Sequence, residues 1–406
     1  MDPLIQLLKP ANDVADPEVS LVVPALNEER TIRLFVQWCK EGLREAGVAG
    51  EILIIDSGSD STTQIALEEG ARVLKTPRRG LGRAYIDALP FIRGRYAILG
   101  DCDCTYDFRR LKPFVEKLRE GYEFVMGTRM RGTIEKGAMP PLHRYLGTPV
   151  TTWILNQLFS SRFSDIHCGM RGISRDALER MRLTSQSWEY ASEMVLKSVR
   201  MKLRTTEVPI HFLKDRDGRL SHHKRSGWLS PWKAAWINLR EMFVYGADYL
   251  LLRPGVISLA LGLFLVLPLS FGPVEIGGVQ LSLYWMLFGM SLVLLGVQCI
   301  YLGILARVFF DYSGDATRRA LQAFPYNRTA FTSAGVFAFG CALVAWLAVD
   351  YVQSDFKLWS VPVPSGYLAV TGITLMLCAF ATFSFLLLLH GFQLTKKFRP
   401  LETSGL

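Results

Sequence analysis

YAILGDCDCTYD, at residues 96–107, joins four mostly apolar residues to a loop with three aspartates and two cysteines. A short buried strand that ends in a polar loop is typical of a parallel sheet, in which ligands bind at the carboxyl ends of the strands. The loop offers two kinds of chemistry. Its cysteines suit a soft metal such as zinc, whereas its aspartates suit a hard cation that binds phosphates.

The same strand-and-loop arrangement recurs through the first 215 residues. Apolar runs typical of strands lie at 19–23, 52–55, 72–74, 96–99 and 124–126. Segments with helical spacing of apolar residues separate them, at 28–46, 61–69, 81–92 and 108–120. The alternation predicts an α/β fold with a mostly parallel sheet and helices on both faces.

The loops that follow the five predicted strands are acidic, basic or rich in glycine. They read PALNEE (24–29), DSGSD (56–60), TPRRGLG (76–82), DCDCTYD (101–107) and GTRMRG (127–132). Because carboxyl ends of parallel strands share one edge of a sheet, we expect all five loops to face one crevice. No G-x-G-x-x-G or G-x-x-x-x-G-K-[ST] motif occurs, but the turn at 80–82, beside Arg78 and Arg79, could hold an anion at a helix N-terminus.

Beyond Pro254 the chain becomes strongly apolar. Four runs, at 255–271, 281–306, 331–349 and 367–389, are about long enough to cross a bilayer as helices, and their centres carry no Asp, Glu, Lys or Arg. The sequence therefore predicts four transmembrane helices. The expected organisation is a domain at 1–215, a juxtamembrane segment at 216–253 and a membrane domain at 254–406.

The basic residues near these runs predict the orientation of the chain. They gather between the second and third runs and after the fourth, whereas the first loop has none and the third has only Lys357; they are Arg307, Arg318, Arg319, Arg328, Lys396, Lys397 and Arg399. By the positive-inside rule, both termini and the large domain are cytoplasmic, on the inner or plasma membrane of the cell. Residues 1–18 do not resemble a signal peptide.

Charge and cysteine content narrow the class of protein. The formal net charge of +9 fits work against an anionic membrane surface, and no reader motif supports nucleic-acid binding. Seven scattered cysteines in a cytosolic and membrane chain argue against a disulfide framework.

The aspartates at 101 and 103 are better metal ligands than the neighbouring cysteines. A zinc site would combine Cys102 and Cys104 with the later pair His167 and Cys168, but C-x-C is not the usual C-x₂-C spacing. In an extended segment, alternate side chains share a face, which would put both aspartates on one side and both cysteines on the other. This favours Mg²⁺ or Mn²⁺ on the carboxylates and inward packing of the cysteines.

Taken in order, five motifs resemble the family-2 glycosyltransferases of the GT-A fold. They are VVPALNEE (22–29), IIDSGSD (54–60), RGLGRA (79–84), DCD (101–103) and GTR (127–129). Within the family they are most similar to the dolichyl-phosphate mannose synthase and bactoprenol glucosyltransferase branch. SDIHCGMRGISRDAL (164–178), with Met170 in place of an aromatic residue, and TEVPIHF (206–212) resemble later segments of that branch.

The resemblance implies inverting transfer of a hexose from a nucleotide-diphosphate sugar, UDP-glucose or GDP-mannose, to a polyprenyl phosphate at the cytoplasmic membrane face. The implied nucleotide-sugar contacts are Pro24, Leu26, Glu28, Asp56, Asp101, Cys102 and Asp103, with Asp103 as the main metal ligand beside Asp101. Thr105 stands where the family often has glutamine, so Asp107 or water is left as a third ligand. A helix N-cap by Ser59, Asp60 or Ser61 is the alternative for the second half of DSGSD.

Arginines are the expected contacts of the acceptor phosphate, because guanidinium groups match phosphate oxygens. The resemblance implies this role for Arg129, Arg144 and Arg216, and places Arg129 and Asp165 beside Asp101 and Asp103 among the catalytic residues. Asp165 would orient the acceptor or the donor sugar, or else cap a helix. We expect Arg131 and Arg72 to be solvated surface charges.

Tryptophans at 228, 232 and 236 are spaced to form one apolar helix face on the bilayer surface, or else to pack in a core.

Two other functions are considered. A processive polysaccharide synthase lacks support because no Q-x-x-R-W motif occurs. A transporter with a nucleotide-binding regulatory domain would need polar spans, whereas Gln298 is the main polar residue here. Relatives that form homo-oligomers leave the oligomeric state open.

Overall fold

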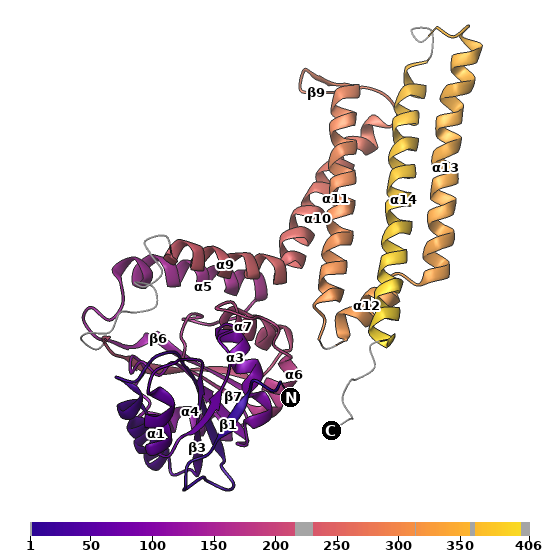
Figure 1. Cartoon of the computed structure of the whole chain (residues 1–406). Helices are drawn as coiled ribbons and strands as arrows, with labels where there is room; N and C mark the ends of the chain where they lie inside the picture. Colours follow the sequence, from indigo (N-terminus) through magenta and orange to yellow (C-terminus); the bar gives the residue numbers. More distant parts are fainter. Residues whose placement is uncertain (1, 216–229, 313, 358–361, 399–406) are drawn as a thin grey trace. The chain divides into compact units, whose positions relative to one another are not determined.

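The computed structural model describes residues 2–215, 230–312, 314–357 and 362–398. The chain divides into two compact units, Met1–Val244 and Tyr245–Leu406 (Figure 1). The first is an α/β unit and the second is helical. The predicted fold class, an α/β domain followed by four transmembrane helices, is confirmed.

The first unit is built on an eight-stranded sheet in the order β1-β4-β3-β2-β5-β7-β6-β8. Strands β4, β3, β2 and β5 are parallel, and β7 is antiparallel to both β5 and β6. β6 therefore runs in the same direction as β5, and β8 is parallel to β6. The strands are β1 (Gln6–Leu8), β2 (Val19–Ala25), β3 (Gly50–Asp56), β4 (Arg72–Lys75), β5 (Tyr96–Leu99), β6 (Phe124–Ile134), β7 (Arg171–Ser174) and β8 (Thr205–Phe212).

Helices cover both faces of this sheet. Helix α1 contacts α2 and α4, which places these three together, while α3 contacts α7 on the other face. The helices of the unit are α1 (Ile32–Ala46), α2 (Thr62–Glu68), α3 (Leu81–Ala88), η1 (Leu89–Phe91), α4 (Lys112–Arg119), η2 (His143–Gly147), α5 (Thr148–Phe159), α6 (Arg175–Met181) and α7 (Tyr190–Arg200). Helix α9 (Ser230–Tyr245) ends this unit and leads to the second.

The five predicted strands all exist because their central residues are apolar and buried on both faces. Val19 to Val23, Leu53 to Ile55 and Ala97 to Ile98 are fully buried, as expected for strands between two layers of helices. The prediction of a loop at 127–132 is wrong. This segment continues β6, and its pairing with β8 is irregular between Thr128 and Thr133.

Arg72 is also a correction, because it is buried and not a solvated surface charge. Its Nη1 donates to Glu51 Oε2 and to the carbonyl of Phe91. Glu51 also accepts hydrogen bonds from Ser20 Oγ (2.6 Å) and Arg93 Nε (2.7 Å). The network joins β2, β3, β4 and the segment before β5. Arg72, which we expected to be a solvated surface charge, therefore links four parts of the first unit.

The second unit contains four helices long and apolar enough to cross a membrane: α10 (Ala247–Leu269), α11 (Leu283–Phe309), α13 (Tyr326–Gln353) and α14 (Val363–Phe398). Short elements lie between them: β9 (Val274–Ile276), β10 (Val279–Leu281) and α12 (Asp315–Ala323). Glycines let the backbones approach closely. A Cβ at Gly262 would lie 2.8 Å from the carbonyl oxygen of Gly289, and one at Gly340 would lie 2.6 Å from that of Gly372. In lipid, where the hydrophobic effect does not drive helices together, small residues allow the close van der Waals packing that stabilises such contacts.

We predict that Arg72→Met destabilises the protein, because the buried Glu51 carboxylate loses one of its two arginine partners and keeps only Arg93 and Ser20. Breaking a buried pair completely costs about 3–5 kcal/mol, so we expect a loss at or below the lower end of this range, which corresponds to a fall in Tm of about 5–10 °C for a unit of this size. Arg33→Met is the matched control, since Arg33 pairs with Glu68 and Glu69 on the surface. We expect it to change the free energy of unfolding by less than about 1 kcal/mol. Equal shifts of Tm, measured by thermal unfolding in detergent, would contradict the role of the network.

The stabilisation lost in Arg72→Met should depend on pH. Burial raises the pKa of Glu51, but hydrogen bonds from Ser20 and Arg93 and the charge of Arg72 hold that pKa below its ordinary value of 4.5. The ionised network therefore adds stability above the ordinary pKa, and this contribution is lost as the pH falls through the lowered folded value. We expect the difference in Tm between the wild type and Arg72→Met to be full near neutral pH and to narrow below pH 4.5.

Candidate active site

The loops after β2 and β3 interlock at the carboxyl edge of the sheet. Asn27 has a positive φ of 57°, and its Oδ1 accepts the main-chain N–H of Ser59 at 2.9 Å. Gly58 approaches so closely that a Cβ there would lie 2.7 Å from the Asn27 nitrogen. Glu29 N also donates to Asp60 Oδ2. The two loops thus form one continuous surface.

The predicted nucleotide contacts on these loops differ in exposure. Pro24 and Leu26 are partly exposed, whereas Glu28 is buried and its Oε2 accepts from the Thr31 hydroxyl at 3.0 Å. Asp56 is fully buried, and its carboxylate accepts from Gly58 N (2.7 Å), Lys75 Nζ (2.8 Å) and the Thr63 hydroxyl. In this structure Asp56 fixes the loop between β3 and α2.

The second half of the DSGSD loop leads into α2, whose N-cap residue Ser61 makes no side-chain cap hydrogen bond, while Asp60 bonds to the first residue of the helix. Asp60 Oδ1 accepts the main-chain N–H of Thr62 at 3.0 Å and its hydroxyl at 2.6 Å, at the start of α2. Burial raises the pKa of Asp60, but these hydrogen bonds from Thr62 bring it below its ordinary value.

The segment after β5 is a turn and not an extended strand end, so the geometric reason given for separating its side chains is wrong. Cys104 has a positive φ of 60°. The expected separation nevertheless exists. Cys102 and Cys104 are buried, with Cys102 Sγ 3.3 Å from the carbonyl oxygen of Pro24 and Cys104 Sγ 3.9 Å from that of Thr31. The cysteines anchor the turn while Asp101 and Asp103 are partly exposed.

Thr105 and Asp107 have partners of their own. The Thr105 main-chain N–H and hydroxyl donate to Asp103 Oδ1 at 3.0 and 2.6 Å, so Thr105 orients that carboxylate. Both oxygens of the buried Asp107 accept from Arg109, at 2.7 and 3.0 Å. Asp107 is thus paired with Arg109, and a third metal ligand, Asp107 or water, stays a prediction.

The carboxylate pair fits a hard divalent cation better than the cysteines fit zinc. Among the described residues, no group of three or more His, Cys, Asp or Glu side chains is placed to hold a metal. Mg²⁺ commonly binds through one or two carboxylates together with substrate phosphates and water, which is what Asp101 and Asp103 offer. Burial raises the pKa of Cys168 to about 12, so this thiol is protonated and is a poor zinc ligand.

The turn at 80–82 is covered by another loop, and the prediction of an anion site there is wrong. The main-chain N–H of Arg83 donates to the carbonyl of Gln186 at 3.1 Å. A Cβ at Gly80 would lie 2.2 Å from that same oxygen, and one at Gly82 would lie 2.2 Å from the Ser185 carbonyl. These carbonyl oxygens occupy the helix N-terminus that an anion would need.

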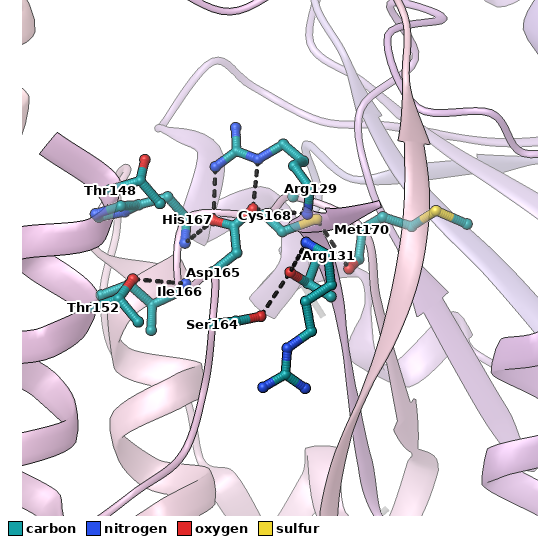
Figure 2. Close-up of polar contacts among 12 residues, drawn as sticks. Arg129, Arg131, Thr148, Thr152, Ser164, Asp165, Ile166, His167, Cys168 and Met170 are labelled. Atoms are coloured by element: carbon teal, nitrogen blue, oxygen red, sulfur yellow. Dashed lines mark hydrogen bonds and ion pairs between the residues drawn. The ribbon is translucent and has the colours of Figure 1, made fainter. Parts of the chain in front are cut away.

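Arg129 and Asp165 form a buried ion pair (Figure 2). Arg129 Nε lies 2.7 Å from Asp165 Oδ2, Nη2 lies 2.8 Å from Oδ1, and the Arg129 main-chain N–H also donates to Oδ2. Burial opposes both charges, but each partner offsets it, so the pKa of Asp165 is lowered and that of Arg129 is raised. Asp165 therefore orients Arg129 and is not a helix cap; within the described residues, the hydrogen bonds of the Arg129 side chain are made by Nε and Nη2.

His167 extends this pair toward α5. Its main-chain N–H donates to Asp165 Oδ1 (3.2 Å), and its Nε2 lies 2.8 Å from the hydroxyl of Thr151. Burial, together with the charge of Arg129, lowers the pKa of His167 to about 4. The imidazole is therefore neutral at physiological pH. The sequence marks His167 only as a candidate zinc ligand beside Cys168, and its place within the SDIHCGMR motif is the one signal for the role seen here.

The other predicted phosphate ligands are less enclosed. Arg144, on η2, is partly exposed and its guanidinium lies 5.4 Å from the ring centroid of Tyr145. Arg131 is largely exposed, as expected, and its Nη1 is 3.3 Å from Glu207. Arg216 and Trp228 lie outside the described residues. In α9, Trp236 is exposed.

The outer face of η2 and α5 is apolar and exposed to solvent. From Pro140 to Phe159 the basic residues are His143 and Arg144, and no acidic residue occurs. Large exposed side chains follow helical spacing on this face: Leu142, Tyr145, Leu146, Val150 and Trp153. An exposed apolar surface of this size marks a place where a membrane, a ligand or a partner binds.

Comparisons with known proteins bear on both units. The model for "Glycosyl transferase family 2" matches residues 20–182, and that for "Glycosyltransferase family 2 C-terminal transmembrane region" matches residues 304–393. The chain is 35% identical to the low-salt glycan biosynthesis hexosyltransferase Agl6 of Haloferax volcanii over 362 residues, which cover 86% of this chain and 84% of the relative. A dolichyl-phosphate hexose transferase of the same organism is 29% identical over 164 residues, or 40% of this chain and 69% of that protein.

Solved structures give lower similarity. Glucosyl-3-phosphoglycerate synthase from Mycobacterium tuberculosis aligns with 55% of this chain and 79% of its own, at 21% identity and a TM-score of 0.43. The mannosyltransferase PcManGT from Pyrobaculum calidifontis, solved with GDP-Man and Mn²⁺, aligns with 90% of this chain and 88% of its own, at 16% identity and a TM-score of 0.36. On the family models and the extent of the match to Agl6, this chain belongs to glycosyltransferase family 2, as a glycosyltransferase with a membrane-embedded region.

Proposed function

We propose that the protein transfers a hexose from UDP-glucose or GDP-mannose to a polyprenyl phosphate at the cytoplasmic face of the membrane. The observation that carries this proposal is the exposed apolar face of η2 and α5 beside Arg144 and above the His167–Asp165–Arg129 network. A lipid phosphate combines an apolar chain with an anionic head. The apolar face of η2 and α5 would contact the chain, and the arginines beside it would bind the head. The similarity to a dolichyl-phosphate hexose transferase supports the same acceptor class.

The donor would lie on the loops after β2, β3 and β5. Asp101 and Asp103 would hold Mg²⁺ or Mn²⁺, with the Thr105 bonds keeping the Asp103 carboxylate in one orientation. The bound cation would neutralise the charge that develops on the departing nucleoside diphosphate. Pro24, Leu26, Glu28, Asp56 and Cys102 would shape the nucleotide pocket, in which Asp56 acts through the loop that it fixes.

The acceptor phosphate would be bound by Arg144, by Nη1 of Arg129 and by Arg216. One of its ionised oxygens attacks the anomeric carbon, and the bond from that carbon to the diphosphate oxygen breaks. A single displacement inverts the configuration. Because a phosphate oxygen is ionised at neutral pH, no proton has to be removed, and the site has no need of a general base. The neutral His167 and the paired Asp165 agree with this chemistry.

The domain limits and orientation complete the proposal. Residues 1–215 would catalyse transfer, 216–253 would bind the acceptor and the membrane surface, and 254–406 would anchor the chain, with both termini in the cytoplasm. Basic loops after the second and fourth spans support this orientation.

The test is a panel of nucleotide sugars with undecaprenyl or dolichyl phosphate, using the full chain in detergent. We expect a hexosyl-phosphoryl-polyprenol, identified by thin-layer chromatography and mass spectrometry, with one donor strongly preferred. Transfer only to a lipid that already carries a sugar would overturn the assigned acceptor.

Asp103→Asn should reduce transfer by at least about 10²-fold, because metal ligation contributes several kcal/mol to departure of the diphosphate. Asparagine retains an oxygen that can accept from Thr105, so the turn is preserved. Asp107→Asn is the control, since Asp107 pairs with Arg109. An equal rise in the KM for Mn²⁺ in the two variants, measured by titration of activity, would show that Asp107 is a ligand instead.

Arg144→Ala should raise the KM for polyprenyl phosphate by about 10- to 100-fold, since hydrogen bonds to a charged group contribute about 1.5–3 kcal/mol. The KM for the nucleotide sugar should stay within about 2-fold, because Arg144 lies on the acceptor side. Arg131→Ala removes an exposed arginine that pairs with Glu207 and should leave both values near those of the wild type. If both variants weaken the acceptor equally, a general surface charge and not Arg144 binds the phosphate.

A further inference from the structure

Arg171, the first residue of β7, is a buried cation whose bonds are all to main-chain oxygens. Its side chain is 1% exposed. Nε donates to the carbonyl of Cys168 (3.0 Å), Nη1 to that of Ala191 (2.6 Å) and Nη2 to that of Ile166 (3.4 Å). It forms no ion pair with a carboxylate of the described chain. Burying a guanidinium is costly, so a buried arginine without a carboxylate partner calls for an explanation.

The three carbonyls belong to two segments that are otherwise separate. Ile166 and Cys168 lie in the turn that precedes β7, and Ala191 lies in the first turn of α7. The planar guanidinium binds both at once, in a geometry that a lysine ammonium does not reproduce. Arg171 therefore fixes the turn at 166–169 relative to the start of α7.

The first of these segments lies against Asp101, and the second is linked through two tyrosines to Gly100, the residue before Asp101. In the first, Gly169 lies so close that a Cβ there would be 2.8 Å from Asp101 Oδ2 and 3.0 Å from the ring of Tyr106. The Gly169 N–H donates to the Tyr106 hydroxyl at 2.8 Å, which fixes this approach.

In the second segment, Tyr190 stacks on Tyr85 with 4.7 Å between ring centroids, and the Tyr85 hydroxyl donates to the carbonyl of Gly100. Asp101 acts electrostatically on both tyrosines, and so does Arg171. The buried positive charge and the Asp101 carboxylate therefore lie in one region of the protein.

We propose that Arg171 is a positioning residue for Asp101. By holding Gly169 and the first turn of α7 in place, it sets the direction of this carboxylate toward the cation that Asp101 and Asp103 would share. The inference rests on the metal assignment within the proposed function.

The experiment measures binding of Mn²⁺ by electron paramagnetic resonance of the full chain in detergent, with UDP or GDP present. Gly169→Ala should weaken Mn²⁺ binding by about 10-fold or more, because its Cβ displaces the Asp101 carboxylate. Arg171→Lys should weaken it by a comparable factor, and Arg171→Met by more, since lysine restores the charge but not the three-way contact. Gly172→Ala is the matched control, because Gly172 follows Arg171 on β7 and its Cβ would meet Leu118 of α4 at 3.1 Å, with no atom of Asp101 among its nearest neighbours. It should leave the affinity within about 2-fold.

Unchanged Mn²⁺ affinity in folded Gly169→Ala and Arg171→Lys would overturn the proposal, as would an equal loss in Gly172→Ala with the same fall in Tm. Failure of the proposed function gives a different result. If the wild type transfers no hexose to polyprenyl phosphate but Mn²⁺ affinity still depends on Gly169 and Arg171, the positioning role stands. If transfer is intact and these variants bind Mn²⁺ normally, the positioning role alone is wrong.

Discussion

The buried bond between Arg129 and Asp165 is the interaction on which the candidate site depends. It ties the middle of β6 to the turn at 164–170 through two side-chain hydrogen bonds and one from the main chain. A buried ion pair adds little net stability compared with an apolar pair, because desolvation offsets the attraction. Its consequence here is geometric, since the bidentate contact allows one orientation of the turn.

That turn links the two halves of the proposed chemistry. On one side, Gly169 lies against the Asp101 carboxylate, where the donor and its cation would bind. On the other, His167 contacts Thr151 of α5, whose outer face is apolar. Three consecutive residues, His167 to Gly169, therefore connect the proposed metal side to the proposed acceptor side. A displacement reaction needs the nucleophile and electrophile placed to within a fraction of an ångström of the reactive geometry, and a short turn that contacts both sides would help to fix their relative positions.

The sequence predicted the strands of the sheet well because Val, Ile and Leu runs buried on both faces leave a strong local pattern. It did not predict β7, which has four residues and reverses direction through contacts far along the chain. The burial of Arg72 and the cover over Gly80 also depend on partners distant in sequence, Glu51 and Gln186. At the turn after β5, the prediction that the cysteines are buried and the aspartates accessible is correct. The reason given for it, strand alternation, is wrong, because the segment is a turn with a positive φ at Cys104.

The proposed chemistry would account for the many fixed charges in this site. A lipid phosphate would arrive already ionised, so the protein would gain little from a residue that moves a proton and much from groups that hold charge in fixed places. Asp60, Asp103 and Asp165 each accept from neighbouring main-chain N–H groups, which fixes the carboxylate oxygens. Glycines at 58 and 169 bring main chain against these loops at distances that no other residue allows. The apolar face of α5 begins within one helical turn of the residue that contacts the polar network, Thr151. An acceptor with a charged head and an apolar chain could therefore place its head on polar groups and its chain on apolar ones.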